Sequence, residues 1–194
     1  MRESFINNYL LRVFKNFLKY IFLPIISLAI LWLFYFKLYG NFHKMDDDFF
    51  RSAQLYEFNM PYYIKEYKIK SIINLRGKSE AQWYKDEMRI SKEYNVNHYD
   101  FGLAATKIQS VATMDRLLEL IKKAEKPVLV HCKAGADRTS LANALYEYKI
   151  KNDKNAEKFI SILYGHFPWL GSRTKAMDIS FENYKKQRPL EHVK

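Results

Sequence analysis

The stretch that decides the fold is residues 128–140, VLVHCKAGADRTS. Val128–His131 predicts a buried strand, because an uninterrupted apolar run is typical of the centre of a parallel sheet. A helix is expected over residues 139–150, so the chain between strand and helix must turn within a few residues. The pattern His-Cys-x-x-Gly-x-x-Arg-Thr arises by chance in on the order of one in 10⁴–10⁵ chains of this length. Its place between a strand and a helix therefore predicts a functional loop.

This loop is suited to holding a phosphate group. Backbone N–H groups between a strand and a helix N-terminus can turn inward as an anion-binding nest, and the helix dipole adds to it. Gly135 permits a tight turn, and the planar fork of Arg138 can hold two phosphate oxygens. Positive partial charges favour the thiolate of Cys132, so Cys132 is the expected nucleophile and the groups around it would stabilise the transition state.

Each residue of the loop also has a plainer interpretation. Cys132 could be a small buried hydrophobic residue, but this explains neither Gly135 nor Arg138. His131 either orients the loop through a backbone contact, which we favour, or is an ordinary histidine at a strand end. Thr139 either donates a hydrogen bond to the sulfur or merely begins the helix.

Outward from the loop, strands and helices alternate along the chain. Further strands are expected over residues 49–51, 69–75 and 96–101. Further helices are expected over residues 61–67, from a capping box at Ser79 and Gln82 to residue 94, from a cap at Ser110 to just before Pro127, and over residues 156–164 and 174–186. This alternation predicts an α/β fold with a mostly parallel central sheet flanked by helices.

Composition excludes several classes of protein. In 194 residues, a hydrophobic fraction of 48% is too high for a disordered chain. Cys132 is the only cysteine, which excludes an intramolecular disulfide framework and a multi-cysteine metal site. The net charge is 32 − 21 = +11, but no basic stripe alternates with aromatic residues, so nucleic acid is not an expected partner. The histidines show no metal-ligand spacing, and no metal site is expected.

The N-terminal segment predicts a membrane anchor. Residues 20–36, YIFLPIISLAILWLFYF, carry no charge and span roughly 25 Å as a helix, while Lys19 and Lys37 can extend to the interface. Apolar residues at helical spacing upstream predict an interfacial helix. A cleaved signal peptide would have a shorter apolar region followed by small residues. We expect an amphipathic segment and transmembrane anchor in residues 1–40, a linker in residues 41–48 and a catalytic domain in residues 49–190.

Charges beside the apolar run predict its orientation. Basic residues near the cytoplasmic end of a span favour that side, whereas acidic residues contribute little. The expectation is a single-pass protein with its N-terminus in the cytoplasm and its catalytic domain outside. Four basic residues precede the run and two follow it: Arg2, Arg12, Lys15 and Lys19 against Lys37 and Lys44.

HCKAGADRT resembles the signature of the cysteine-dependent tyrosine and dual-specificity phosphatases. FFRSAQL, YKIKSIINLRG and YGHF resemble segments of small single-domain members, so the resemblance covers about residues 46–187. It implies that Cys132 forms a phosphocysteine intermediate, that Arg138 binds phosphate, and that no metal or organic cofactor is needed. The implied phosphate-binding residues are Lys133, Ala134, Gly135, Ala136, Asp137 and Arg138.

The resemblance implies phosphomonoester substrates, with phosphotyrosine or another phosphoprotein as the first expectation. HCKAG is similar to the loop of the phosphatase-and-tensin lipid phosphatases, and Asp before Arg-Thr resembles the myotubularin phosphoinositide phosphatases. A phospholipid or inositol phosphate is therefore the alternative substrate, and Lys133 either contacts an anionic headgroup or is a solvated loop lysine. A catalytically inactive phosphate-binding module is a second alternative, which the intact Cys132 and Arg138 disfavour. A sulfur-transfer enzyme fits less well.

The general acid is where the sequence departs from the family pattern. These phosphatases carry an acidic Asp on the loop after the strand that precedes the nucleophile's strand. Aligning YDFGLAATKIQS with that loop places Leu103 at the position of the acid. Asp100, at the expected strand end, and Asp137, next to Arg138, are the remaining candidates. Position favours Asp137, as in the myotubularin resemblance, although it could instead cap the helix.

Overall fold

The computed structural model describes residues 2–190. The chain divides into two compact units, and the boundary in the sequence lies between Tyr39 and Gly40. The first unit contains α1 (Arg2–Phe17), a π-helical turn (Leu18–Phe22) and α2 (Leu23–Tyr39). The π-turn lies just before Pro24, and the N–H of Leu23 donates to Leu18 O. Proline has no N–H to donate, so the ladder of hydrogen bonds readjusts before it.

The N-terminal helix has the length and composition of a membrane span. Among the described residues, Tyr9–Leu31 is the one stretch of helix that meets both criteria; its mean hydropathy is 1.6 and none of it is buried within the chain. The expected apolar run began later, at residue 20, and this helical stretch also takes in part of the segment upstream. Length and composition thus permit this helix to cross a bilayer.

The second unit is built on a five-stranded sheet in the order β1-β2-β5-β3-β4. The strands β2, β5, β3 and β4 are parallel, and β1 pairs antiparallel with β2 at the edge. Their bounds are β1 His43–Lys44, β2 Phe49–Ser52, β3 Ser71–Asn74, β4 Asn97–Asp100 and β5 Val128–His131. The expected mostly parallel sheet is confirmed, with β5 at its centre and every residue of β5 buried.

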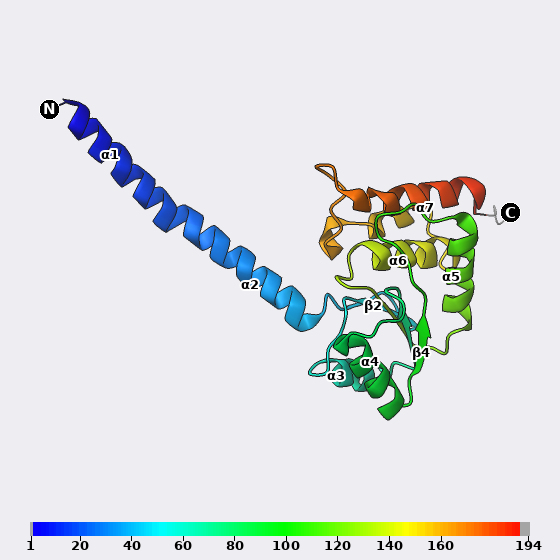
Figure 1. Cartoon of the computed structure of the whole chain (residues 1–194). Helices are drawn as coiled ribbons and strands as arrows, with labels where there is room; N and C mark the ends of the chain where they lie inside the picture. The colour runs from blue at the N-terminus through cyan, green and yellow to red at the C-terminus, as the bar shows by residue number, and fades with distance from the viewer. Residues whose placement is uncertain (1, 191–194) are drawn as a thin grey trace. The chain divides into compact units, whose positions relative to one another are not determined.

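Helices cover both faces of the sheet, and each face has its own apolar core (Figure 1). On one side lie α5 (Val111–Lys123), α6 (Asp137–Lys149) and α7 (Ala176–Gln187). On the other lie α3 (Met60–Glu66) and α4 (Gln82–Glu93). The parallel strands end in register: Ser52 and Asn74 both pair with His131, and Asp100 pairs with Asn74. The residues that follow these strands therefore meet at one edge of the sheet.

Four local expectations differ in detail from the structure. Residues 41–48 are not merely a linker, because His43 and Lys44 pair with Arg51 and Phe50. The capping box at Ser79 does not form, because Ala81 occupies the N-cap position and Ser79 Oγ accepts the N–H of Ala81 instead.

The other two differences concern helices. The helix expected from residue 139 begins at Asp137, where an acidic residue in the first turn suits the helix dipole. Residues 156–164 form two 3₁₀ turns, Ala156–Phe159 and Ile162–Tyr164, in place of one helix. The hydroxyl of Ser161 caps the second turn by accepting the N–H of Leu163, which starts a new element at that point. The cap that Ser110 provides for α5, by accepting the N–H of Thr113, is confirmed.

Candidate active site

The phosphate loop, residues 132–136, connects the end of β5 to the start of α6. Cys132 is 2% exposed, whereas Lys133 and Ala134 face solvent. Gly135 has a φ of +68°, and a Cβ added there would lie 2.6 Å from the backbone N of Ala53. Only glycine permits both this conformation and this approach to the chain after β2. The loop therefore turns where the sequence predicted, and its nucleophile candidate is buried.

Arg138 is held over the loop by two backbone carbonyls. Its Nη1 donates to Leu75 O at 3.1 Å and to Leu103 O at 3.2 Å, and these carbonyls lie on the segments after β3 and β4. Its Nε is buried and has no hydrogen-bond partner among the described residues, and the same is true of Thr139 Oγ1. Buried polar atoms without partners are rare, and at this place the oxygens of a phosphate or a thiolate sulfur would satisfy them.

A second arginine, Arg51 on β2, lies beneath the loop. Its Nη2 donates to Gly135 O at 2.6 Å and to Ser140 Oγ at 2.8 Å, and its guanidinium lies 3.8 Å from the centre of the Tyr164 ring. Burial lowers the pKa of Arg51 to about 10, so it stays charged at neutral pH. Arg51 thus ties the loop to the first turns of α6. Sequence reasoning missed this role, although a charged residue inside a short apolar strand is a usable signal.

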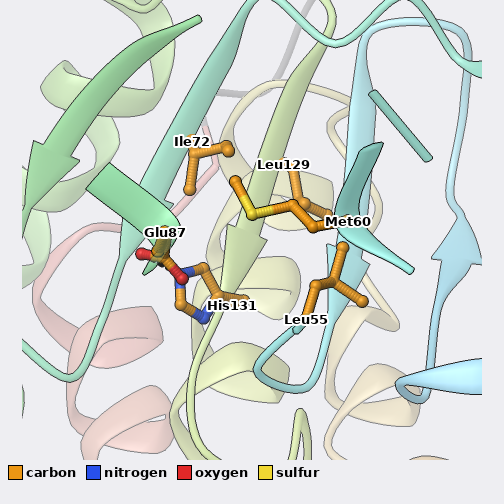
Figure 2. A pocket seen from close by; sticks show the side chains of 6 residues that line it. All are labelled: Leu55, Met60, Ile72, Glu87, Leu129 and His131. Atoms are coloured by element: carbon orange, nitrogen blue, oxygen red, sulfur yellow. Dashed lines mark hydrogen bonds and ion pairs between the residues drawn. The ribbon is translucent and has the colours of Figure 1, made fainter. Parts of the chain in front are cut away.

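Behind the loop, a buried carboxylate joins two histidines. Figure 2 shows the Glu87 carboxylate from α4 against the ring of His131, in a pocket also lined by Leu55, Met60, Ile72 and Leu129. Glu87 Oε1 lies 3.1 Å from His131 Nε2 and 2.7 Å from His98 Nε2, and Glu87 Oε2 accepts from Gln54 Nε2.

Electrostatics keep that carboxylate ionised. Burial acts to raise the pKa of Glu87, but the charge and hydrogen bond of His131, followed by those of His98, outweigh burial and hold the pKa well below its ordinary value. On its other side, His131 Nδ1 lies 3.4 Å from Cys132 O. This geometry fits the orienting role expected of His131, because the contact of Nε2 with Glu87 fixes the direction in which Nδ1 points.

The two candidate acids lie in different surroundings. Asp137 Oδ1 lies 2.8 Å from Nδ1 of the buried His166, whose Nε2 lies 2.9 Å from Asp178 Oδ2. Burial acts to lower the pKa of His166, but the hydrogen bonds to Asp137 and Asp178 outweigh it and raise that pKa. Asp100 at the end of β4 accepts from Asn74 Nδ2 at 2.9 Å and from the hydroxyl of Tyr84 at 2.6 Å.

The loop after β4 contributes backbone to the site. Leu103, which the sequence alignment placed at the expected position of the acid, is buried, and its N–H donates to Leu75 O. Its carbonyl accepts from Arg138. A further residue that sequence reasoning missed is Arg76, which donates to Gln54 Oε1 at 2.8 Å and lies over the Trp83 ring at 3.4 Å. Burial and then the positive charge of Arg138 lower the pKa of Arg76.

The site contains the residue types of phosphate transfer and no metal cluster within the part of the chain described: residues 2–190 hold no group of three or more His, Cys, Asp or Glu side chains that could bind a metal ion. Residues 41–185 match the model of the family PTP-NADK, described as DSP-PTPase phosphatase fused to NAD+ kinase. No curated protein matches the sequence.

Three solved phosphatases illustrate the structural similarity. TpbA of P. aeruginosa shares 20% identity over 74% of this chain and 84% of its own, with a TM-score of 0.59, and a variant of it is solved with phosphotyrosine. PTPMT1 in complex with PI(5)P shares 16% identity over 75% of this chain and 97% of its own, with a TM-score of 0.58. The core catalytic domain of the PP-IP phosphatase SIW14 from S. cerevisiae shares 18% identity over 76% of this chain and 89% of its own, with a TM-score of 0.57.

These matches define the class first: the fold is that of the cysteine-dependent tyrosine and dual-specificity phosphatases. The family match spans most of the chain, so the protein belongs to the PTP-NADK family of that superfamily and is a phosphatase. The resemblance read from the sequence is thereby confirmed.

Proposed function

We propose that this phosphatase hydrolyses phosphomonoesters through a phosphocysteine intermediate while anchored to a membrane by its N-terminal helix. The observation that carries the chemistry is the buried Cys132 in a loop followed by Arg138, whose buried Nε has no hydrogen-bond partner within residues 2–190. The anchor is supported by the apolar helix Tyr9–Leu31. In this proposal the backbone N–H groups of residues 133–138 surround the phosphate oxygens, and Arg138 holds two of them.

The reaction takes two displacements at phosphorus. The Cys132 thiolate attacks phosphorus and forms an S–P bond as the bond to the leaving oxygen breaks, and Asp137 gives that oxygen a proton. A water then attacks the phosphocysteine, Asp137 takes up one proton of the water, and phosphate leaves as the thiolate reforms. The hydroxyl of Thr139 donates a hydrogen bond to the sulfur. His166 holds Asp137 and supplies or accepts the shared proton across the 2.8 Å contact.

The first candidate substrate is phosphotyrosine or another phosphoprotein. The similarity to TpbA, which is solved with phosphotyrosine, supports it at the level of the fold. A second candidate is a phosphoinositide or another phospholipid, because PTPMT1 is solved with PI(5)P and because the proposed anchor keeps the site beside lipid headgroups.

The experiment is a phosphate-release screen of the full chain reconstituted in bilayers. It compares a phosphotyrosine peptide, phosphoinositide and phosphatidylglycerophosphate vesicles, and an activated aryl phosphate, each with Cys132→Ser as the control. Turnover of the aryl phosphate that is lost in Cys132→Ser supports the enzyme, and the preferred natural substrate separates the two candidates. A folded wild-type chain that binds phosphate but hydrolyses none of these would instead be a phosphate-binding module.

A further inference from the structure

The loop formed by residues 162–170 exposes an unusual amount of apolar surface. Leu163 is 77% exposed and Leu170 is 94% exposed. Ile162, Phe167 and Trp169 are exposed as well. Single exposed apolar residues are common on soluble proteins, but five within nine residues form a patch that marks an interaction surface. In Figure 1 this orange segment extends beyond the N-terminal end of α7.

The backbone keeps the tip of this loop apolar at an energetic cost. Leu170 has a φ of +53° and Gly171 a φ of +77°. A residue with a Cβ is strained in this left-handed region, where glycine or asparagine would be cheaper. Trp169 and Phe167 pack edge to face, with ring centres 4.9 Å apart. A leucine is thus held at the fully exposed tip, beside two aromatic rings.

The loop is fastened to the phosphate loop on its other side. Asn41 Nδ2 donates to Ala134 O in the phosphate loop and to Tyr164 O, each at 3.0 Å. His166 contacts Asp137 at 2.8 Å. Residues 162–170 therefore form part of the rim of the catalytic site, and whatever binds this loop is brought to the phosphate loop.

Charge and chain length indicate which partner fits. Arg173 and Lys175 follow the loop and are exposed, and no acidic residue occurs from residue 158 to residue 177. Aromatic and leucine side chains flanked by basic residues suit the interface of an anionic bilayer. Asn41 lies five positions after Phe36, the last residue of the uncharged run, which limits that stretch of chain to at most about 18 Å.

We propose that residues 162–170 dock into the headgroup region of the same bilayer that the N-terminal helix spans, with Leu170 and Trp169 inserted and Arg173 and Lys175 on anionic headgroups. This rests on the proposed anchor. Docking holds the phosphate loop at the depth of the headgroups, so phosphate groups at the membrane surface reach Cys132 without leaving the bilayer. The partner is the lipid surface itself, and the loop acts as the second contact beside the anchor.

Because Cys132 is the only cysteine of the chain, its replacement allows a single cysteine to be introduced elsewhere for labelling. In a Cys132→Ser background, single cysteines replace Leu170, Leu28 in the helix, or Ile150, which is 37% exposed at the opposite end of α6. Each full-length variant is labelled with an environment-sensitive fluorophore and reconstituted into phosphatidylcholine–phosphatidylglycerol vesicles with or without a nitroxide-labelled lipid. Circular dichroism checks that each variant folds.

Docking predicts that the nitroxide quenches the probes at residues 170 and 28 and leaves the probe at residue 150 bright. Adding Arg173→Gln and Lys175→Gln should weaken quenching at residue 170 only, and only in vesicles with phosphatidylglycerol. A probe at residue 170 that is quenched no more than the probe at residue 150 overturns the docking surface, whatever residue 28 shows. An unquenched probe at residue 28 overturns the anchor instead, so the two failures are distinguishable.

Discussion

Single residues in the phosphate loop each meet a requirement that few other residue types could meet. Gly135 lies so close to Ala53 that any side chain would collide with backbone. Arg138 has enough donors to bind two carbonyls through one nitrogen and still keep Nε free of any partner in the described chain. A lysine has one nitrogen and would lose either the carbonyls or the phosphate. At this scale, geometry accounts for the sequence pattern.

The proton donor is the residue-scale assignment most open to test. We predict that Asp137→Asn slows hydrolysis of an alkyl phosphate about 10²–10⁴-fold, since a poor leaving group needs a proton, but leaves an activated aryl phosphate much less affected. Steady-state phosphate release from both substrates measures this. Asp100→Asn is the matched control, because its carboxylate is occupied by Asn74 and Tyr84. If the leaving-group dependence appears in Asp100→Asn instead, the acid lies after β4 and the assignment to Asp137 is wrong.

At the scale of elements, α4 supports the nucleophile's strand by inserting Glu87 behind it. The carboxylate is 2% exposed and contacts His131 at the end of β5 and His98 in β4. Removing one partner of such a buried pair leaves the other charge without compensation. The network therefore links a helix and two strands at the edge of the sheet where the catalytic loops meet.

Glu87 makes the stability of this region dependent on acid. The pKa of Glu87 in the folded state lies well below the ordinary value of 4.5. The ionised carboxylate therefore stabilises the fold fully above pH 4.5, and this contribution is lost as the pH falls through the lowered pKa. We predict that Glu87→Gln lowers the free energy of unfolding of the Gly40–Lys194 unit by about 3–5 kcal/mol at neutral pH. Denaturant unfolding should show this difference shrinking as the pH falls below 4.5.

The control for this prediction is Glu119→Gln, which removes an exposed ion pair with Lys122. Exposed pairs contribute little, so a change within about 1 kcal/mol is expected there. A Glu87→Gln deficit that stays constant from neutral pH to strongly acidic pH would contradict the ionised state assigned to Glu87.

Local patterns predicted the elements better than they predicted the contacts between them. The apolar run of β5 and the cap at Ser110 are encoded by neighbouring residues, and both were predicted correctly. The roles of Arg51, Glu87 and His166 depend on contacts with Ser140, His131 and Asp137, which are 89, 44 and 29 residues away in sequence, so a local pattern does not specify these partners. The capping box at Ser79 shows that a local pattern can also mislead. Its residues match the pattern, but the helix begins at Gln82 with Ala81 as its N-cap.

At the scale of the whole molecule, an apolar helix precedes a phosphatase domain that begins within two residues of its end. The excess of basic residues before the apolar run predicts that the N-terminus lies in the cytoplasm and the catalytic domain outside. The expected result is that a membrane-impermeant maleimide labels an Ile150→Cys variant in intact spheroplasts. Labelling that occurs only after the membrane is permeabilised means that the domain faces the cytoplasm.

The central claim is that phosphate passes through the sulfur of Cys132. The most direct measurement is rapid acid quenching of wild-type protein during turnover, followed by mass spectrometry of the peptide that contains residues 128–140. The account predicts a phosphorylated Cys132 that appears before free phosphate accumulates, and its absence in Cys132→Ser. Turnover by a folded Cys132→Ser protein, or phosphate found on a different residue, would contradict it.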